Sequence, residues 1–393
     1  MASTAIRLTA VAMVLFIITV QADTKNEDQN LLSTVSNRLI PKLFKHIGGT
    51  KEENVVFSSV GLVQNLAVVS ILTNHSGVTS DLLHVLGLHE AKQLEELRHE
   101  LKQVLSKFET EVRTESAFEG ENTTEATGLF NYLHVNPEHK LRDELMNRLT
   151  NELRTNLTYD TSLEEGTFSV SVDTGVLSAW RERESLVVFT LLQYATEEQF
   201  TLHNGSTRTV PLVPHIGMLG TRQHPNFTLV RLPLQAASTH LVLLLPHSSE
   251  EFGRLVDAMP DVENLTDSGD HREEITLWIP QMLAISSLEL NPTLHKLGGE
   301  QLFKADFSAV TKSDEPLVLS GISQKSFFST SFTSVKSITE SEARFGMKRN
   351  RREIEKRSIT FNKPFLFFIE RTDLRLVLTA GCINDPTQFP TQA

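Results

Sequence analysis

The sequence predicts an α+β fold, with helices concentrated in the front part of the chain and antiparallel strands in the back part. Apolar residues recur at helical spacing in three segments before residue 113. After residue 126, short apolar or alternating segments bounded by turn residues dominate. A chain of 393 residues, 39% hydrophobic and 22% charged, is long enough to bury a large core. Helices and strands that segregate along the chain are typical of α+β proteins.

The first 22 residues are expected to be a cleaved secretory signal peptide. Arg7 precedes an apolar run from Leu8 to Val20, and Val20 and Ala22 are small residues at the two positions that a signal peptidase reads. A membrane anchor needs about 20 apolar residues, and this run is shorter. We therefore expect residues 23–393 to form one mature domain.

The front part predicts three helices and one strand. The segment 31–44 has helical periodicity, and 54–58 is a short strand. Ser58 and Ser59 can cap a helix over 60–72, which is apolar nearly all round and therefore expected at the centre of the fold. Residues 89–112 predict an amphipathic helix whose alternating charges face water.

The back part predicts mostly strands. A hairpin is expected at the end of the chain, formed by its last two strands. The predicted strands are 128–135, 168–172, 184–194, 207–213, 228–232, 240–246, 274–280, 365–370 and 375–379. The predicted helices are 141–153, 250–259 and 291–297.

Composition excludes several functions. A net charge of −12 argues against a nucleic-acid partner, and after the first run there is no apolar stretch long enough for a membrane span. Cys382 is the single cysteine, which rules out an internal disulfide framework and a cysteine-cluster zinc site. It lies in an apolar segment and is expected to be buried. We find neither Gly-x-Ser-x-Gly nor His-Glu-x-x-His, and we expect no enzyme activity, metal or cofactor.

Asn-x-Ser/Thr sequons agree with export. Six occur, and together with a signal peptide they predict some N-glycosylation. Asn226 lies in a strand-like segment and is the weakest candidate. The candidate sites are Asn74, Asn122, Asn156, Asn204, Asn226 and Asn264.

A basic segment near the end of the chain does not have the pattern of a core element. Seven basic residues lie between positions 344 and 357 of a protein whose net charge is −12. A connection this long is usually functional or disordered. It is either a solvated loop or a protease substrate. Arg349-Asn-Arg-Arg352 has the form that subtilisin-like proprotein convertases cut, and Lys356-Arg357 is a second dibasic site.

The residues just before the basic run alternate. Thr339, Ser341 and Ala343 are small, whereas Glu340 and Glu342 are charged. A period of two indicates a strand with one face buried and one face in water. The segment can therefore be a loop or a strand.

Several motifs resemble the serpins, over nearly the whole secreted chain. The strongest are Phe361-Asn-Lys-Pro-Phe-Leu-Phe-Phe-Ile369 with Asn384-Asp-Pro386, and 54–59 with Leu66-Ala67, Thr79 and Leu86-Gly-Leu88. Further similarities are Thr196-Glu-Glu-Gln-Phe200, Val210-Pro-Leu-Val213, Gly217-Met218, Leu244-Leu-Pro246, Leu297-Gly298 with Phe303, and Phe307-Ser-Ala-Val310.

The resemblance implies a single serpin domain over residues 23–393, with an exposed reactive-centre loop over about 336–360. It implies a monomeric suicide-substrate inhibitor whose partner is a target serine protease. The cut loop would insert into the main sheet as a new strand. By the spacing of the family, the scissile bond is Arg352–Glu353, with Arg349 and Arg351 aiding recognition by an Arg-specific, trypsin-like or furin-like protease.

Two further sites follow from the same resemblance. The implied hinge of the loop comprises Ile338, Thr339, Glu340, Ser341, Glu342 and Ala343. The implied shutter, beneath the main sheet, comprises Ser58, Ser59 and Gly61.

Departures from the family pattern support two alternative functions. Lys336, Ser337 and Ile338 replace the Glu-Glu-Gly of the family hinge, and Phe345 is bulky for an inserting strand. The region 160–195 is also shorter than in the family. The first alternative is a non-inhibitory serpin that acts as a binding, carrier or decoy protein whose loop is only cleaved. A weaker alternative is a precursor cut at Arg352 or Arg357.

Overall fold

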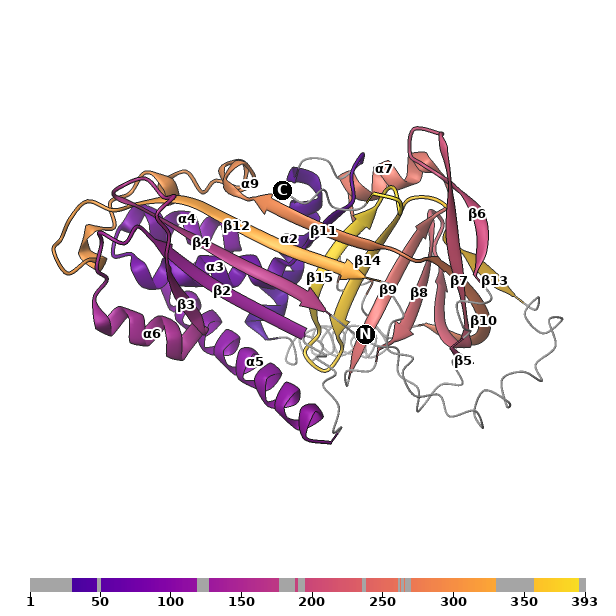
Figure 1. Ribbon diagram of the computed structural model, residues 1–393, viewed down its shortest axis with the longest axis horizontal. Helices are drawn as coiled ribbons and strands as arrows, with labels where there is room; N and C mark the ends of the chain where they lie inside the picture. The colour runs from indigo at the N-terminus through magenta and orange to yellow at the C-terminus, as the bar shows by residue number, and fades with distance from the viewer. Residues whose placement is uncertain are drawn as a thin grey trace, which may run out of the picture.

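A computed structural model describes residues 30–47, 51–118, 127–176, 188–189, 195–234, 238–260, 262, 265, 270–329 and 357–388. Two β-sheets and a group of helices make up this part of the chain (Figure 1). Helices α2, α3 and α4 lie behind one face of the smaller sheet, on the side away from the viewer. The combination of helices with large mixed sheets confirms the predicted α+β class.

The helices of the described residues are mostly in the front part, as the periodicity predicts. They are α2 (Leu31–His46), α3 (Ser59–Leu72), α4 (Ser76–Leu86), α5 (Ala91–Phe118), α6 (Asp143–Leu153), α7 (Ser249–Asp257) and α9 (Asn291–Lys296). Two short 3₁₀ helices are η2 (Gln301–Phe303) and η3 (Ser308–Val310).

Five strands form the smaller sheet, in the order β11-β12-β4-β2-β3. They are β2 (Thr127–Val135), β3 (Thr155–Tyr159), β4 (Thr167–Val176), β11 (Leu283–Glu289) and β12 (Val318–Ser329). The pairs β12–β4 and β2–β3 are parallel, and β11–β12 and β2–β4 are antiparallel.

The larger sheet has ten strands. Its main path runs β1-β15-β14-β9-β8-β7-β10-β13, and β5 and β6 also pair with β7. The strands are β1 (Val55–Phe57), β5 (Val188–Phe189), β6 (Thr196–Thr201), β7 (Thr207–Gln223), β8 (Phe227–Pro233), β9 (Thr239–Pro246), β10 (His271–Pro280), β13 (Ser358–Thr360), β14 (Phe365–Arg371) and β15 (Leu376–Ile383).

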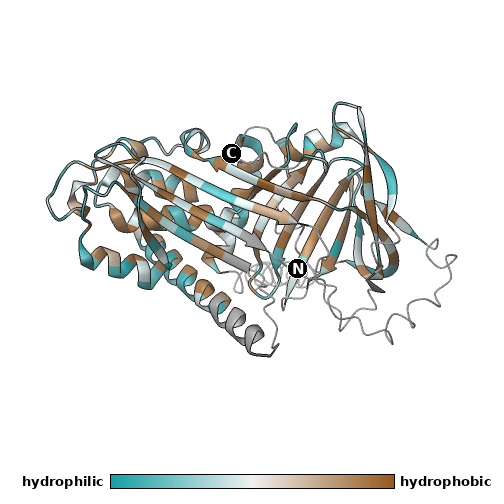
Figure 2. Cartoon of the chain, in the orientation of Figure 1, coloured by the Kyte–Doolittle hydropathy of each residue, from teal (hydrophilic) through white to brown (hydrophobic). Residues whose placement is uncertain are grey.

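Hydrophobic residues, coloured brown, run along β8, β9, β14 and β15 of this sheet (Figure 2). Every residue of β14 and β15 is buried, and the two strands form the antiparallel hairpin that the sequence predicts. Strands buried on both faces read as continuous apolar runs, which explains why this hairpin is easy to recognise in the sequence.

Helix α3 is the central buried helix that its sequence predicts. All its residues except Ser70 are buried. It begins after Ser58, whose side chain accepts a hydrogen bond from the N–H of Gly61 at 3.0 Å. The predicted cap is therefore Ser58, while Ser59 is the first helical residue.

Other elements differ from the expectations. Helix α4 and strands β3, β6, β11, β12 and β13 were not predicted, and α5 extends to Phe118. Strand β12 carries polar residues, including Gln324 and Ser326, on its buried face, so it lacks an apolar signature. Of the predicted strand 184–194, only Val188–Phe189 lies within the described residues, as β5.

Candidate functional site

The centre of the smaller sheet is a parallel seam between β4 and β12. The two strands pair from Thr167 opposite Val318 to Gly175 opposite Phe327. Strand β12 ends at Ser329, and the described chain resumes only at Arg357. A segment that turned back after Ser329 and entered this seam would run antiparallel to both strands. It could take over the backbone hydrogen bonds that β4 and β12 now give to each other.

Below the seam, the cap of α3 is joined to β12 by a side-chain amide. Gln324 accepts a hydrogen bond from the N–H of Ser58 at 2.9 Å and donates to the carbonyl of the same residue at 2.9 Å. The Ser58 hydroxyl donates to the carbonyl of Leu378 on β15 at 2.5 Å. One residue thus connects α3, the smaller sheet and the larger sheet. Sequence reasoning found Ser58 but missed Gln324, because their contact spans 266 positions.

The predicted shutter residues Ser58, Ser59 and Gly61 lie together at the start of α3. The hydroxyl of Ser59 hydrogen-bonds to that of Ser36 on α2 at 2.8 Å. A Cβ atom at Gly61 would lie 2.8 Å from the Nε2 of Gln324. Since real Cβ contacts are longer than this, the glycine leaves the space that the amide occupies.

Two further polar contacts reach the seam strands. The hydroxyls of Thr174 on β4 and Ser326 on β12 hydrogen-bond across the seam at 2.6 Å. From α3, the Asn65 amide donates to the carbonyl of Ser323 on β12 at 3.2 Å, and it accepts from Asn131 on β2 at 2.7 Å. Buried hydrogen bonds of this kind hold the strands in one arrangement. The Thr174–Ser326 bond joins β4 directly to β12 and is lost if the seam opens.

The chain re-enters the fold at a firm anchor. The N–H of Thr276 on β10 donates to the carbonyl of Arg357 at 2.9 Å, and Ser358–Thr360 then pair in parallel with β10. The guanidinium of Arg357 forms an ion pair with Glu273, which also accepts a hydrogen bond from Thr221 at 2.5 Å. The last three residues of the expected loop range of about 336–360 form strand β13.

The hinge residues and the expected reactive bond lie outside the described residues. This applies to Ile338, Thr339, Glu340, Ser341, Glu342 and Ala343, and to Arg349, Arg351, Arg352 and Glu353.

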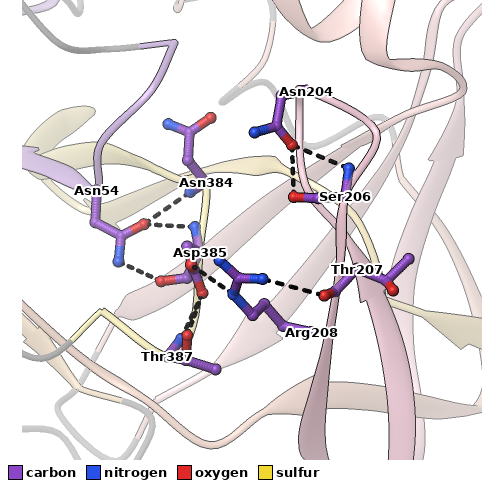
Figure 3. Close-up of polar contacts among 8 residues, drawn as sticks. All are labelled: Asn54, Asn204, Ser206, Thr207, Arg208, Asn384, Asp385 and Thr387. Atoms are coloured by element: carbon purple, nitrogen blue, oxygen red, sulfur yellow. Dashed lines mark hydrogen bonds and ion pairs between the residues drawn. The ribbon is translucent and has the colours of Figure 1, made fainter.

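Four of the six sequon asparagines are described, and their side chains are exposed: Asn74, Asn156, Asn204 and Asn226. Asn122 and Asn264 lie outside the described residues. Asn226 precedes β8 instead of lying within it. The side-chain oxygen of Asn204 accepts hydrogen bonds from the N–H and the hydroxyl of Ser206 (Figure 3), at 3.0 and 2.7 Å.

A polar clamp holds the end of β15 against β1 (Figure 3). The side-chain oxygen of Asn54 accepts from the N–H groups of Asn384 and Asp385, at 2.8 and 3.0 Å. Its amide nitrogen donates to the carbonyl of Asp385 at 2.6 Å. The carboxylate of Asp385 lies 3.7 Å from the guanidinium of Arg208. The motif that begins at Asn54 and the motif Asn384-Asp-Pro386 are far apart in the sequence, and these hydrogen bonds join them in the fold.

Cys382 is a fully buried thiol, as its apolar surroundings predict. Burial raises its pKa to about 12, so the thiol is protonated and inert at physiological pH. None of the helices in the described part of the chain is long and apolar enough to span a membrane.

Comparisons with known proteins agree on one family. The family model described as Serpin (serine protease inhibitor) matches residues 192–386. Iripin-5 of Ixodes ricinus is 29% identical over 198 residues, which are 48% of this chain and 49% of Iripin-5. The chain thus spans about half the length of that relative. Human Serpin B13 is 24% identical over 401 residues, covering 90% of this chain and 99% of Serpin B13.

The fold agrees with solved structures as well. The crystal structure of human thyroxine-binding globulin complexed with thyroxine superposes with a TM-score of 0.73 at 16% identity. The superposition covers 91% of this chain and 100% of the globulin. At this identity the similarity establishes the fold alone.

Proposed function

Because the chain belongs to the serpin family, we propose that it is a secreted suicide-substrate inhibitor of an Arg-specific serine protease. Serpins typically act as inhibitors of proteases and not as catalysts. The protease would cleave the Arg352–Glu353 bond, guided by Arg349 and Arg351. The cleaved loop would then enter the seam between β4 and β12. We propose that the inhibitor acts as a monomer, without nucleic acid, membrane or cofactor.

The observation that carries the proposal is the seam itself. Strand β12 leads into the hinge segment of the sequence. Because β12 and β4 are parallel, an antiparallel strand can insert between them and hydrogen-bond to both. The floor of the seam is crowded, since a Cβ at Gly61 would also lie 3.0 Å from Val172 and 3.1 Å from Thr174. An entering strand must therefore be small on its inner face.

The hinge sequence fits that requirement. In a strand, Thr339, Ser341 and Ala343 share one face, and Glu340 and Glu342 share the other. The small residues suit the buried floor of the seam, and the carboxylates suit the solvent side. The match between the alternation and the two sides of the seam supports insertion.

The anchor at β13 favours Arg352 over Arg357 as the cleaved residue. The carbonyl of Arg357 is hydrogen-bonded to Thr276, and its side chain is paired with Glu273. A protease must bind the backbone and the side chain of the residue after which it cuts, and these groups of Arg357 are already engaged. Arg352 lies five residues before Arg357 in the sequence.

The proposed chemistry uses the nucleophile of the protease. Its serine hydroxyl attacks the carbonyl carbon of Arg352, the peptide bond to Glu353 breaks, and Glu353 leaves with a new amino group. Arg352 remains esterified to the protease and connected to β12, while Glu353 stays connected to β13. Insertion of the segment before Arg352 into the seam would then carry the acylated protease away from its starting position.

The alternative is a non-inhibitory serpin whose loop is cleaved without trapping. Phe345 has the same strand parity as Thr339 and Ala343, so full insertion would bring a bulky ring to the crowded floor. Ile338 also lacks the backbone freedom of the glycine that the family has there. If Phe345 and Ile338 stop insertion early, the protease is not trapped, and a binding, carrier or decoy role is favoured.

Secretion is part of the proposal. The signal-peptide pattern of residues 1–22 and the exposure of the four described sequon asparagines support export and N-glycosylation. Export would place the loop in the compartment where secreted trypsin-like proteases and convertases act.

The test is incubation of the secreted protein with trypsin and, separately, with a furin-like convertase. A band stable in denaturing gels, at the mass of the protease plus the inhibitor fragment that ends at Arg352, is the expected result. Mass spectrometry should find the remaining fragment, which begins at Glu353. Arg352→Ala is the matched control and should abolish that band. Complete cleavage after Arg352 without a covalent band would refute inhibition of these proteases and favour the decoy role.

A further inference from the structure

A row of aromatic side chains lies on the outer face of the smaller sheet. Phe130, Tyr132 and His134 occupy alternate positions of β2 and therefore share one face, and Phe130 is 51% exposed. The buried Asn131, Leu133 and Val135 share the opposite face. Only residues 160–166 connect β3 to β4, so no helix lies between these strands in the chain. We call Phe130, Tyr132 and His134 the aromatic row.

Two members of the row are held firmly. The rings of Tyr132 and His134 are stacked, with centroids 6.1 Å apart and an interplanar angle of 24°. His134 is fixed by the hydroxyls of Thr158 on β3 and Ser171 on β4, at 2.6 and 2.7 Å. Burial lowers the pKa of His134, although Asp160 and Asp173 oppose the shift, so its ring is neutral at neutral pH. The row is thus an uncharged π surface, in which Tyr132 and His134 are stacked and His134 is hydrogen-bonded to both neighbouring strands.

A sequon lies directly beside this surface. Asn156 of β3 is opposite Tyr132 in the parallel register, and Thr158 is opposite His134. Opposite residues of paired strands share a face, so the exposed Asn156 side chain lies on the side of the aromatic row. Its amide nitrogen lies 3.5 Å from the Asn131 carbonyl and carries two hydrogens, one of which a sugar can replace.

We propose that the aromatic row is the docking platform of an N-linked glycan on Asn156, with the first N-acetylglucosamine packed over Tyr132. The C–H groups on the face of a pyranose ring carry slight positive charge and suit the negative face of an aromatic ring. From Phe130 to His134 the row extends about 13 Å along β2, room for more than one sugar. The diagonal neighbours of Asn156 on β2 are within reach of its glycan.

The geometry favours a glycan over a protein partner. A stable protein interface needs roughly 20–30 residues on each side, and the row offers three side chains. Strand β3 is the edge of the sheet, and a glycan on its outer face also protects that edge from pairing with another chain. The inference rests on the proposed export, but it is independent of the reactive loop and of inhibition.

The test uses the protein secreted from eukaryotic cells. Glycopeptide mass spectrometry measures occupancy of Asn156 and then the rate at which an endoglycosidase releases that glycan from the folded protein. We expect occupancy and slow release, with faster release in Tyr132→Thr. We also expect Asn156→Gln to lower the midpoint of thermal unfolding by about 1–2 °C, a shift absent when Tyr132 is already Thr.

Tyr159→Thr is the matched control. Tyr159 is 58% exposed on the same strand, but it lies three positions from Asn156 and therefore on the opposite face. It should leave the release rate unchanged. The proposal fails if Asn156 is unoccupied, if Tyr132→Thr and Tyr159→Thr release the glycan equally, or if sedimentation shows a dimer that Tyr132→Thr dissociates. Each failure would leave the protease test unaffected.

Discussion

Gln324 of β12 hydrogen-bonds to both backbone polar groups of Ser58, the residue that caps α3. Its amide oxygen accepts from the N–H and its amide nitrogen donates to the carbonyl, each at 2.9 Å. Strand β12 is thereby fastened to the start of the central helix. If the sheet opens for an inserting strand, β12 should stay with α3, and the contact to break is the one between β12 and β4.

The first prediction concerns the space beside that amide. Gly61→Ala should lower the free energy of unfolding by about 1–2 kcal/mol, because its Cβ would lie 2.8 Å from the Gln324 amide. Denaturant unfolding measures the change. Gly253→Ala in α7 is the control, since its Cβ would meet only His203 at 3.8 Å, and it should be stabilising or neutral. Equal stability of the two variants would show that the space beside Gln324 is not tight.

The second prediction concerns the seam. Thr174→Val removes the hydroxyl that Ser326 contacts across the seam, so a synthetic peptide of residues 338–351 should enter the sheet faster. Loss of about 1 kcal/mol from the closed sheet would raise the rate roughly five-fold. Native gels and mass spectrometry can follow the formation of the complex between the protein and this peptide. Thr174→Ser keeps the hydroxyl and should retain the original rate, so acceleration in both variants would exclude the hydrogen bond as the cause.

The third prediction concerns the anchor of the loop. Glu273→Gln removes the ion pair with Arg357 but keeps an oxygen for the Thr221 hydroxyl. Because Arg357 is half-exposed, the pair is worth no more than about 1 kcal/mol. Trypsin cleavage after Arg357 should therefore rise by up to about five-fold relative to cleavage after Arg352. An unchanged ratio of the two cleavage products in mass spectra would contradict a protective role for Glu273.

The fourth prediction concerns acid stability. Burial lowers the pKa of His215 on β7 from 6.5 to about 3, so the folded protein binds this proton more weakly than the unfolded chain. The contribution of His215 is fully present above pH 6.5 and is lost as the pH falls from 6.5 toward 3. Between pH 7.5 and 5.0 the loss should be about 2 kcal/mol.

Urea unfolding of the wild type and His215→Leu at both pH values isolates this contribution. The variant should lose less stability on acidification than the wild type. Equal losses in the two proteins would mean that His215 does not control the acid sensitivity.

Much of the fold can be predicted from local pattern. Ser58 precedes an apolar helix and caps it, and the apolar runs of β14 and β15 form the hairpin. Strand β12 escapes prediction because Gln324 and Ser326 make its buried face polar. Their partners, Ser58 and Thr174, are distant in sequence, so no local signal marks these positions as buried.

Only part of the candidate site can be predicted from the sequence. The serpin resemblance identifies Gly61 as a shutter position, but the reason for glycine is a contact with Gln324 that only the folded chain reveals. The aromatic row is hidden in the same way, since Tyr132 and Asn156 meet through strand pairing across 24 positions. Periodicity identifies elements, whereas the pairing of strands determines which side chains meet.

The most direct test of the central claim is the stability of the protein after cleavage of the Arg352–Glu353 bond by a protease that is not trapped. Insertion between β4 and β12 should raise the midpoint of thermal unfolding sharply and protect the amides of residues 339–350 from hydrogen exchange. An unchanged midpoint, with those amides exchanging as fast as before cleavage, would contradict insertion and with it the inhibitory mechanism.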